Sequence, residues 1–437
     1  MNTRHRMWIF VLASAIALAS SAFGAEWIGA DLSFVPRLEA NGAGFTQSGL
    51  ERSAPEIFRS AGFNIVRLRL WHTPSEPWHG LDSTVAFAVR AQALGFDVLL
   101  DFHYSDSWAD PSQQTKPAAW QGLAFSALVD SIRAYTSAVM CRFRDADVVP
   151  VAVQLGNEID PGMLWNDGRV GGVYDTPQQW AQLAALLNAA GAGARDSLPP
   201  SEQPELVVHV ADGGDSAFCH WYFDHLVDLD VDFDVIGLSY YPWWHGSMSD
   251  LESNLTFLAG RYGKDILIAE TGYPWTLDWD DDTHNMVGLP EQLLPQYPAT
   301  PLGQAFFISD VRQIVAALPS GRGRGVCLWE PDWISTPTFG SAWENVALFD
   351  FDGAALIAFE SYPGLVPKRL TVYRRGDDIE LRWADDASPF YRVFSAATSD
   401  GPFTTVEGTT TGTVFTVEGV ATADSVRFFI VRGRTGP

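Results

Sequence analysis

VAVQLGNEID, residues 151–160, is a short apolar run that passes directly into Gly, Asn and Glu, and DILIAETGYPW, residues 265–275, changes in the same way. Such β-branched runs indicate strands buried on both faces, as parallel strands beneath a layer of helices are. A polar residue at the end of such a strand leaves the core and lies at the rim of the sheet. Glu158 and Glu270 are therefore both predicted at a carboxyl-terminal rim.

Similar runs recur along the first 360 or so residues and alternate with helix-like stretches. The predicted strands are Trp27–Ser33, Asn64–Trp71, Asp97–Tyr104, Val148–Glu158, Glu205–Asp212, Phe233–Tyr241, Asp265–Tyr273 and Gly325–Trp333. The predicted helices between them include Thr84–Leu94, Leu123–Phe143 and Pro177–Ala194. Eight alternations predict an α/β fold, a closed (β/α)8 TIM barrel. An open doubly wound sheet is the alternative, but no Gly-rich phosphate loop follows the first predicted strand.

The amino terminus has the pattern of a cleavable secretory signal over residues 1–24. Arg4, His5 and Arg6 precede an apolar run from Trp8 to about Ala19, and small residues follow. A membrane anchor is the alternative, although the run is shorter than the roughly 20 residues that span a bilayer. We therefore expect a secreted or periplasmic protein with no membrane insertion after cleavage.

The composition changes near residue 365, which predicts a barrel domain over residues 25–365 and a second domain over residues 369–437. Tyr362–Pro367 is the predicted linker. The predicted strands of the tail are Leu370–Arg375, Ile379–Ala384, Tyr391–Ala397, Phe403–Gly408, Val414–Val420 and Val426–Arg432. Their alternating pattern predicts a small all-β sandwich that resembles a short fibronectin type III module. Its role is open between a spacer or stabilising appendage and a unit that binds polysaccharide or the cell surface.

The net charge of the protein argues against polyanionic partners but does not identify a particular partner. The 28 basic and 53 acidic residues give a formal charge of −25, which disfavours nucleic acid and anionic membranes because phosphate is repelled. A neutral substrate suits this balance better, and we expect a monomer. Cys141, Cys219 and Cys327 allow at most one internal disulfide and are predicted to be mainly packed thiols.

The predicted rim carries acidic and aromatic side chains. The acids are Asp31, Asp101, Glu158, Asp212, Glu270 and Glu330. The fourth and seventh strands lie three steps apart in a circle of eight, so Glu158 and Glu270 can face each other, and retaining glycosidases hold two carboxyl groups about 5 Å apart. The rim also carries Trp71, Trp108, Trp243, Trp244, Trp275, Trp329 and Trp333. Indole faces stack on sugar rings but also fill ordinary cores, so only their joint position favours a glycan-binding groove.

Several longer segments, in order, resemble one known family. They are GADLSFVPRLEANGAGF, NIVRLRLWHTP, LLDFHYSDSWADPSQQTKPAAW, VQLGNEID, FDVIGLSYYPWWHG, IAETGYPW and LWEPDWI. This series closely resembles glycoside hydrolase family 53, the arabinogalactan endo-β-1,4-galactanases of clan A, over roughly residues 26–362. The resemblance does not extend to the tail.

The resemblance implies an endo-acting enzyme that hydrolyses galactan by double displacement with retention. Glu158 would be the acid/base and Glu270 the nucleophile, and this chemistry requires no cofactor. Another clan A endoglycosidase, acting on mannan or a β-glucan, is one alternative. A polysaccharide-binding protein without catalysis is the other, although the intact glutamates count against it.

The same match and their chemistry suggest roles for three residues around the nucleophile. Asn157 would hold the sugar 2-hydroxyl. Arg69 would keep Glu270 ionised through its fixed positive charge. Tyr240 would donate a hydrogen bond to Glu270.

Three further residues are predicted in the sugar subsite. His103 and Asp31 would line it, and Trp329 would form its stacking floor. For each, the alternative is that the side chain only supports the mouth of the barrel.

Metal chemistry is disfavoured, since the nine histidines form no HxH or HExxH pattern. A structural calcium is a separate possibility, because bacterial members of the family can hold calcium in the loop after the seventh strand. Asp280, Asp282 and His284 fit the ligand pattern of that loop, but Met286 stands where Asn is expected. Oxygen-rich loops suit calcium, and an ordinary solvated acidic loop is the alternative.

Overall fold

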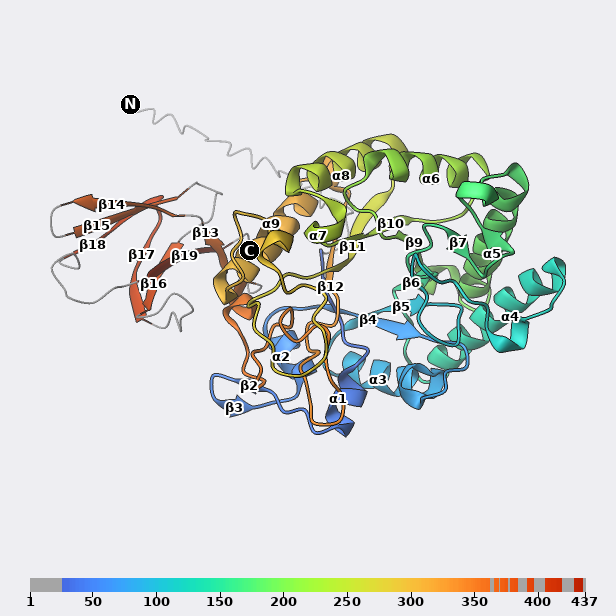
Figure 1. Cartoon of the computed structure of the whole chain (residues 1–437), viewed down its shortest axis with the longest axis horizontal. Coiled ribbons are helices and arrows are strands. Elements are labelled where there is room, and N and C mark those ends of the chain that lie inside the picture. The colour runs from blue at the N-terminus through green and yellow to red at the C-terminus, as the bar shows by residue number, and fades with distance from the viewer. Residues whose placement is uncertain are drawn as a thin grey trace, which may run out of the picture.

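The structure is a computed structural model, and it describes residues 26–361, 365–368, 370–375, 378–383, 391–396, 405–418 and 428–434. The predicted secretory signal, residues 1–24, lies outside the described residues. Figure 1 shows a large helix-covered barrel with a smaller all-β unit beside it.

Eight parallel strands form a closed barrel within the described part of the chain. They are β1 (Trp27–Asp31), β4 (Ile65–Leu70), β5 (Asp97–Phe102), β6 (Ala152–Leu155), β9 (Glu205–Val210), β10 (Val235–Tyr240), β11 (Asp265–Thr271) and β12 (Gly323–Leu328). Their order around the barrel is β1-β12-β11-β10-β9-β6-β5-β4. Each overlaps one predicted strand, so the predicted (β/α)8 barrel is confirmed.

Helices cover the outside of this barrel (Figure 1). They are α1 (Val35–Ala40), α2 (Ala54–Ser60), α3 (Leu81–Ala93), α4 (Phe125–Arg144), α5 (Pro177–Arg195), α6 (Ser216–Asp228), α7 (Pro242–His245), α8 (Met248–Tyr262) and α9 (Pro301–Ala316). The three helices predicted by residue range correspond to α3, α4 and α5. Side-chain oxygens of Thr176, Asp215, Ser247 and Thr300 accept backbone N–H groups at the starts of α5, α6, α8 and α9, which fixes where these helices begin.

Short elements complete the loops of the barrel. Two small hairpins pair β2 (Thr46–Gln47) with β3 (Leu50–Glu51) and β7 (Gly162–Met163) with β8 (Gly168–Arg169). The 3₁₀ turns are Pro77–His79, Ala118–Trp120, Gly172–Tyr174, Pro200–Glu202, Pro290–Gln292, Pro319–Gly321 and Ile357–Ser361. In the described part of the chain, no helix has the length and apolar character that crossing a membrane requires.

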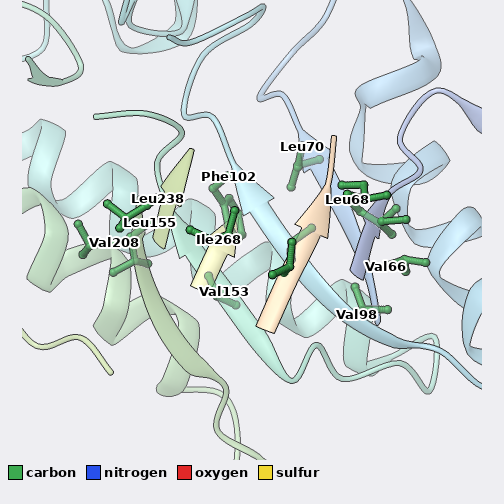
Figure 2. Packing of buried hydrophobic residues seen from close by; sticks show 14 of the residues in the cluster. Val66, Leu68, Leu70, Val98, Phe102, Val153, Leu155, Val208, Leu238 and Ile268 are labelled. Carbon is green, nitrogen blue, oxygen red and sulfur yellow. The ribbon is translucent and has the colours of Figure 1, made fainter. Parts of the chain in front are cut away.

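Alternation along the strands separates two packing layers. Side chains that face the helices form the main core; Figure 2 shows Val66, Leu68, Leu70, Val98, Phe102, Val153, Leu155, Val208, Leu238 and Ile268 from it. The intervening positions face the barrel axis, and a smaller cluster fills it: Trp27, Ile65, Leu99, Ala152, Val207, Val235, Leu267, Ala269 and Cys327. Successive side chains of a strand point to opposite faces, so this alternation decides which residues reach the mouth.

The C-terminal strands form two antiparallel sheets. One has the order β13 (Leu365–Lys368), β19 (Phe428–Arg434), β16 (Tyr391–Ala396) and β17 (Thr405–Thr410). The other has the order β14 (Thr371–Arg375), β15 (Asp378–Arg382) and β18 (Val414–Val417). Leu381, Tyr391, Val393 and Val431 are among the residues of a common buried cluster. The predicted small all-β unit is confirmed, and its likeness to a fibronectin type III module stays a prediction.

The boundary between the two parts differs from the prediction. The predicted linker, residues 362–367, includes the start of β13, which pairs with β19. The change of composition and the Pro and Gly residues suggested a linker, but β13 is an edge strand, where a proline is tolerated. The three cysteines are free thiols, and Cys219 and Cys327 are buried, as predicted for packed thiols.

Candidate active site

Glu158 and Glu270 lie together at the mouth of the barrel. One carboxylate oxygen from each and a ring nitrogen of His209 all lie within 4.8 Å of one another. Glu158 follows β6 on a tight turn in which Gly156 has φ 99° and Glu158 itself has φ 46°. A left-handed φ is costly for a residue with a side chain and is typical of functional sites. The turn directs Glu158 toward Glu270, and the Ser239 hydroxyl donates to its Oε1 at 2.6 Å.

Glu270 reaches the mouth because the register of β11 shifts at its end. Leu267 and Ala269 face the barrel axis, so strict alternation would turn residue 270 toward the helices. The β10–β11 pairing instead skips a position, and Ser239 pairs with Glu270. A bulge of this kind changes the direction of a side chain. It places Glu270 beside the residue that donates to Glu158.

Arg67 organises the buried side of this pair. It is 1% exposed, and its guanidinium lies 2.8 Å from Asp31, 2.9 Å from Asp101 and 2.9 Å from Glu270. It also donates to Asn157 Oδ1 at 2.7 Å. A guanidinium has five N–H donors in a rigid plane, so one side chain fixes groups from four strand ends.

The two glutamates have different surroundings, which separates their ionisation. Burial raises the pKa of Glu270 to about 7, although the Arg67 cation and the Tyr241 hydroxyl both oppose this rise. Burial and the neighbouring Glu270 and Asp160 carboxylates raise the pKa of Glu158 well above its usual range. Since no cation contacts Glu158 among the described residues, Glu270 ionises first and Glu158 retains the proton.

The predicted role of Arg69 is wrong. Arg69 Nη2 contacts Glu330 at 2.9 Å, and Arg67 contacts Glu270 instead. Both arginines face the barrel axis, but they lie two residues apart on β4, about 6.6 Å along the strand. Arg69 is therefore one layer higher, where its guanidinium lies over the rings of Phe34 and Trp108.

The predicted contact of Tyr240 is also wrong, by one residue. Tyr241 donates its hydroxyl to Glu270 Oε2 at 3.2 Å. Tyr240 faces the helices, stacks on Phe307 of α9 and donates to the Gly246 carbonyl. Neighbouring residues on a strand point in opposite directions, so only one of the two can reach the site.

His103 and Asp31 are buried and hydrogen-bonded beside Arg67, and their place in the sugar subsite stays a prediction. Asp31 has no exposed surface and accepts from Arg67 and Ser33. His103 Nε2 lies 3.1 Å from Asp101, and its Nδ1 accepts from the Ala109 amide. Burial lowers the pKa of His103, so the neutral ring donates to Asp101. Both side chains take part in the buried network around Arg67.

Two other predicted subsite residues lie nearer the opening. Trp329 is half-buried, and its ring makes an edge contact with Trp343 at 5.0 Å and a tilted contact with Trp108 at 6.2 Å. Asn157 is 5% exposed and donates through Nδ2 to the Ala109 carbonyl at 2.9 Å. These contacts hold the Trp329 indole and the Asn157 side-chain amide in fixed orientations at the mouth.

The site includes residues that the sequence did not single out. They are Arg67, Gln154, His209, Ser239 and Tyr241. Arg67 was the most accessible to prediction, because a charged residue inside a strand buried on both faces must have a partner. Gln154, His209 and Ser239 occupy inward positions by the same alternation, and all three are joined by hydrogen bonds through His209.

The predicted calcium ligands do not come together. In the loop after β11, Asp280, Asp282 and His284 are exposed, while Asp281 turns inward and accepts from Ser335 at 2.6 Å and the Ser341 amide at 2.8 Å. Within the described residues, the one converging group of three potential ligands is Glu158, His209 and Glu270. Asp280, Asp282 and His284 therefore do not form a ligand group in this structure.

Comparisons with known proteins agree with this fold. The model of glycosyl hydrolase family 53 matches residues 27–362. The arabinogalactan endo-β-1,4-galactanase of Cellvibrio japonicus is 34% identical over 351 residues, 78% of this chain and 91% of that protein. The solved Ignisphaera aggregans GH53 catalytic domain has a TM-score of 0.72 at 36% identity, covering 76% of this chain and 94% of that one. A structure of fungal β-1,4-galactanases has a TM-score of 0.69 at 31% identity, covering 78% and 99%. The chain therefore belongs to glycosyl hydrolase family 53.

Proposed function

We propose that this protein is an endo-acting, retaining glycosidase that hydrolyses β-1,4-galactosidic linkages in galactan and type I arabinogalactan. The observation that carries the reaction type is the approach of a Glu158 oxygen and a Glu270 oxygen to within 4.8 Å. Retaining enzymes hold their carboxyl groups about 5 Å apart, whereas inverting enzymes leave about 6.5–9.5 Å for a water molecule. The names of the family relatives support galactan as the substrate.

In the proposed mechanism, Glu158 and Glu270 act in two steps. Glu158 gives its proton to the glycosidic oxygen as that bond breaks, and Glu270 attacks the anomeric carbon to form a glycosyl ester. Glu158, now ionised, removes a proton from water, and the water oxygen displaces Glu270 from the same carbon. Each step inverts the anomeric centre, so the product retains the β configuration.

The surroundings of each glutamate suit its proposed role. Glu270 must be ionised to attack, and the Arg67 guanidinium at 2.9 Å favours that form. Glu158 must be protonated at the start, and its raised pKa favours that form. After the first step Glu270 is a neutral ester, which removes its repulsion and lets Glu158 ionise as the base.

We also propose that Asn157 binds the sugar 2-hydroxyl. Its amide nitrogen carries two hydrogens, of which Ala109 accepts one. Arg67 holds the amide oxygen at 2.7 Å and so fixes the direction of the remaining N–H. Trp329 is proposed as the surface on which the same sugar ring stacks. We also propose that the protein acts outside the cytoplasm, on the basis of its predicted secretory signal. We propose that it acts as a monomer.

The test is release of reducing ends from unbranched β-1,4-galactan by the purified mature protein, with mannan and a β-glucan in parallel. Galactan alone should be cleaved, and Glu270→Gln should abolish the activity. Proton NMR during the reaction should show the β-anomer first. Cleavage of mannan or β-glucan instead would overturn the substrate, an α-anomer would overturn retention, and no cleavage of any glycan would favour a binding protein.

A further inference from the structure

A hollow at the barrel mouth lies outside the residues assigned above. It has a volume of about 440 Å³ and is lined by Asp212, Gly214, Asp215, Ser216, Trp244, His245, Gly246, Asp250 and Ser253. This volume is within the range of pockets that hold small ligands, about 300–1,000 Å³. One wall is the loop between β9 and α6, and the other is α7 with the start of α8.

The two walls meet through a close backbone approach. A Cβ atom at Gly214 would lie 1.8 Å from the His245 carbonyl oxygen. Only glycine permits this contact, so the walls keep a fixed distance. The hollow is therefore a preformed feature rather than a gap between independent loops.

The position of the hollow relative to the glutamates follows from the strand order. Between β6, which leads to Glu158, and β11, which carries Glu270, the shorter way around the barrel crosses only β9 and β10. The hollow lies above these two strands. Arg67, His103 and Trp329 come from β4, β5 and β12, which lie on the longer way around. The two glutamates thus separate the mouth into two sides.

The hollow is connected to both glutamates. The Gly213 amide donates to the Ser239 carbonyl at 3.0 Å, and the Ser239 hydroxyl donates to Glu158. On the other side, the Trp244 ring makes an edge contact with Tyr241 at 5.6 Å, and Tyr241 donates to Glu270.

We propose that this hollow binds the second galactosyl unit on the leaving-group side of the scissile bond, with Trp244 as its stacking surface and Asp212 as its hydrogen-bond acceptor. This inference rests on the proposed function and deepens it. An endo-acting enzyme must hold the chain on both sides of the cut. The proposed sugar contacts of Asn157 and Trp329 put the glycone sugar on the side of Arg67, so the leaving part would extend over β9 and β10.

The chemistry of the lining suits a neutral sugar. Trp244 is 55% exposed, and an exposed indole presents the flat apolar face on which sugar C–H groups stack. The Asp212 carboxylate accepts no hydrogen bond from the described residues, so it is available to a sugar hydroxyl. It is the second residue after β9 and stands between the buried Ala211 and Gly213.

A cation is the competing occupant, since three carboxylates line the hollow. Two of them are already engaged at helix starts. Asp215 Oδ1 accepts the Ala217 and Phe218 amides at 2.9 Å each, and Asp250 Oδ2 accepts from the amide and hydroxyl of Ser247. The lining carboxylates form no converging ligand group among the described residues. The geometry therefore favours the sugar.

The test compares Trp244→Ala with wild type on end-labelled β-1,4-galacto-oligosaccharides from trisaccharide to hexasaccharide. We expect kcat/KM for the hexasaccharide to fall about tenfold, the loss of one aromatic stacking contact, while the trisaccharide changes less than about twofold. The cut should also move toward the reducing end, because the variant holds fewer sugars beyond the scissile bond. Asp212→Asn should shift the cut in the same direction, with a loss of roughly two- to tenfold.

Phe257→Ala is the matched control. Phe257 is an aromatic residue of α8 that is 37% exposed but does not line the hollow. The Phe257→Ala variant should therefore give the same cleavage products as wild type. Equal losses on short and long substrates, or an unchanged pattern in both hollow variants, would overturn the inference. A wild-type protein that leaves all these oligosaccharides intact would overturn the proposed galactanase function together with it. Thermal unfolding of each variant confirms that the proteins compared are folded.

Discussion

Replacing Tyr241 with Phe should change the pH at which the enzyme becomes active. The Tyr241 hydroxyl donates to Glu270 Oε2 at 3.2 Å, and this bond favours the ionised carboxylate. Without it the pKa of Glu270 should rise further above its usual range. Under the proposed mechanism Glu270 attacks as the anion, so the acidic limb of kcat/KM reports its ionisation. The limb should therefore move to higher pH.

The size of the shift follows from the bond. A hydrogen bond to a charged group contributes about 1.5–3 kcal/mol, and a 3.2 Å distance lies at the long end of the normal range. Taking the lower value gives a shift of about 1 pKa unit and, below the shifted pKa, a loss of about tenfold in kcat/KM. The assay is kcat/KM on galactan between about pH 4 and 9, a range that spans the ionisation of Glu270.

Tyr240→Phe is the control, because the two residues are neighbours of the same type. The Tyr240 hydroxyl donates to the Gly246 carbonyl and faces the helices, so its loss should cost about 1 kcal/mol of stability and leave the acidic limb in place. The reasoning fails if the acidic limb of kcat/KM in the Tyr241→Phe variant stays where it is or moves to lower pH. It also fails if Tyr240→Phe shifts that limb by the same amount.

Three further predictions follow from the same structure. Glu158→Ala should lower kcat/KM on galactan by roughly 10²–10⁴-fold but cost much less on aryl glycosides whose leaving group needs no proton; equal losses on both would contradict its role as the acid. EDTA should leave the melting temperature unchanged, because Asp280, Asp282 and His284 do not converge, and a decrease that Ca²⁺ reverses would contradict this. Burial raises the pKa of Asp160 to about 7 in the folded protein, so the folded state binds more protons than the unfolded state between about pH 4 and 7 and the free energy of unfolding falls as pH rises through that window. Asp160→Asn should reduce this slope in urea unfolding at a series of pH values, and an unchanged slope would show that other groups cause it.

The barrel could be predicted from sequence because each strand is short, apolar and followed by polar residues. These properties depend on burial alone, and burial of parallel strands is the same in every barrel of this kind. The family prediction was confirmed for a related reason, since long ordered segments specify a fold and a site together. The approach of Glu158 and Glu270 at the mouth could be predicted from the positions of two strand ends alone.

The contacts around that pair were predicted less well, for two reasons. Arg67 and Arg69 point in the same direction, so a motif with both residues does not say which layer reaches Glu270. Tyr240 and Tyr241 point in opposite directions, and alternation along β10 distinguishes them once the inward set is known. Alternation would still fail at Glu270, where a register shift between β10 and β11 breaks the pattern. Such shifts depend on the packing of two strands and have no signal within either one.

The charge balance around Arg67 explains why this network is suited to catalysis rather than to stability. Three carboxylates, those of Asp31, Asp101 and Glu270, surround one buried guanidinium, so full ionisation would leave net negative charge in the barrel. The Asp101 carboxylate gains a second donor from His103, and although burial opposes it, Arg67 and His103 hold the pKa of Asp101 below its usual value. Burial raises the pKa of Glu270 to about 7, and the negative charges of Asp31 and Asp101 contribute to this rise. Glu270 is therefore the carboxylate of the three that most readily takes up a proton. A carboxylate of raised pKa is a more basic nucleophile than an ordinary one, and Arg67 keeps it ionised often enough to react. Under the proposed mechanism, the buried Asp31 and Asp101 thus set the reactivity of Glu270 as the nucleophile.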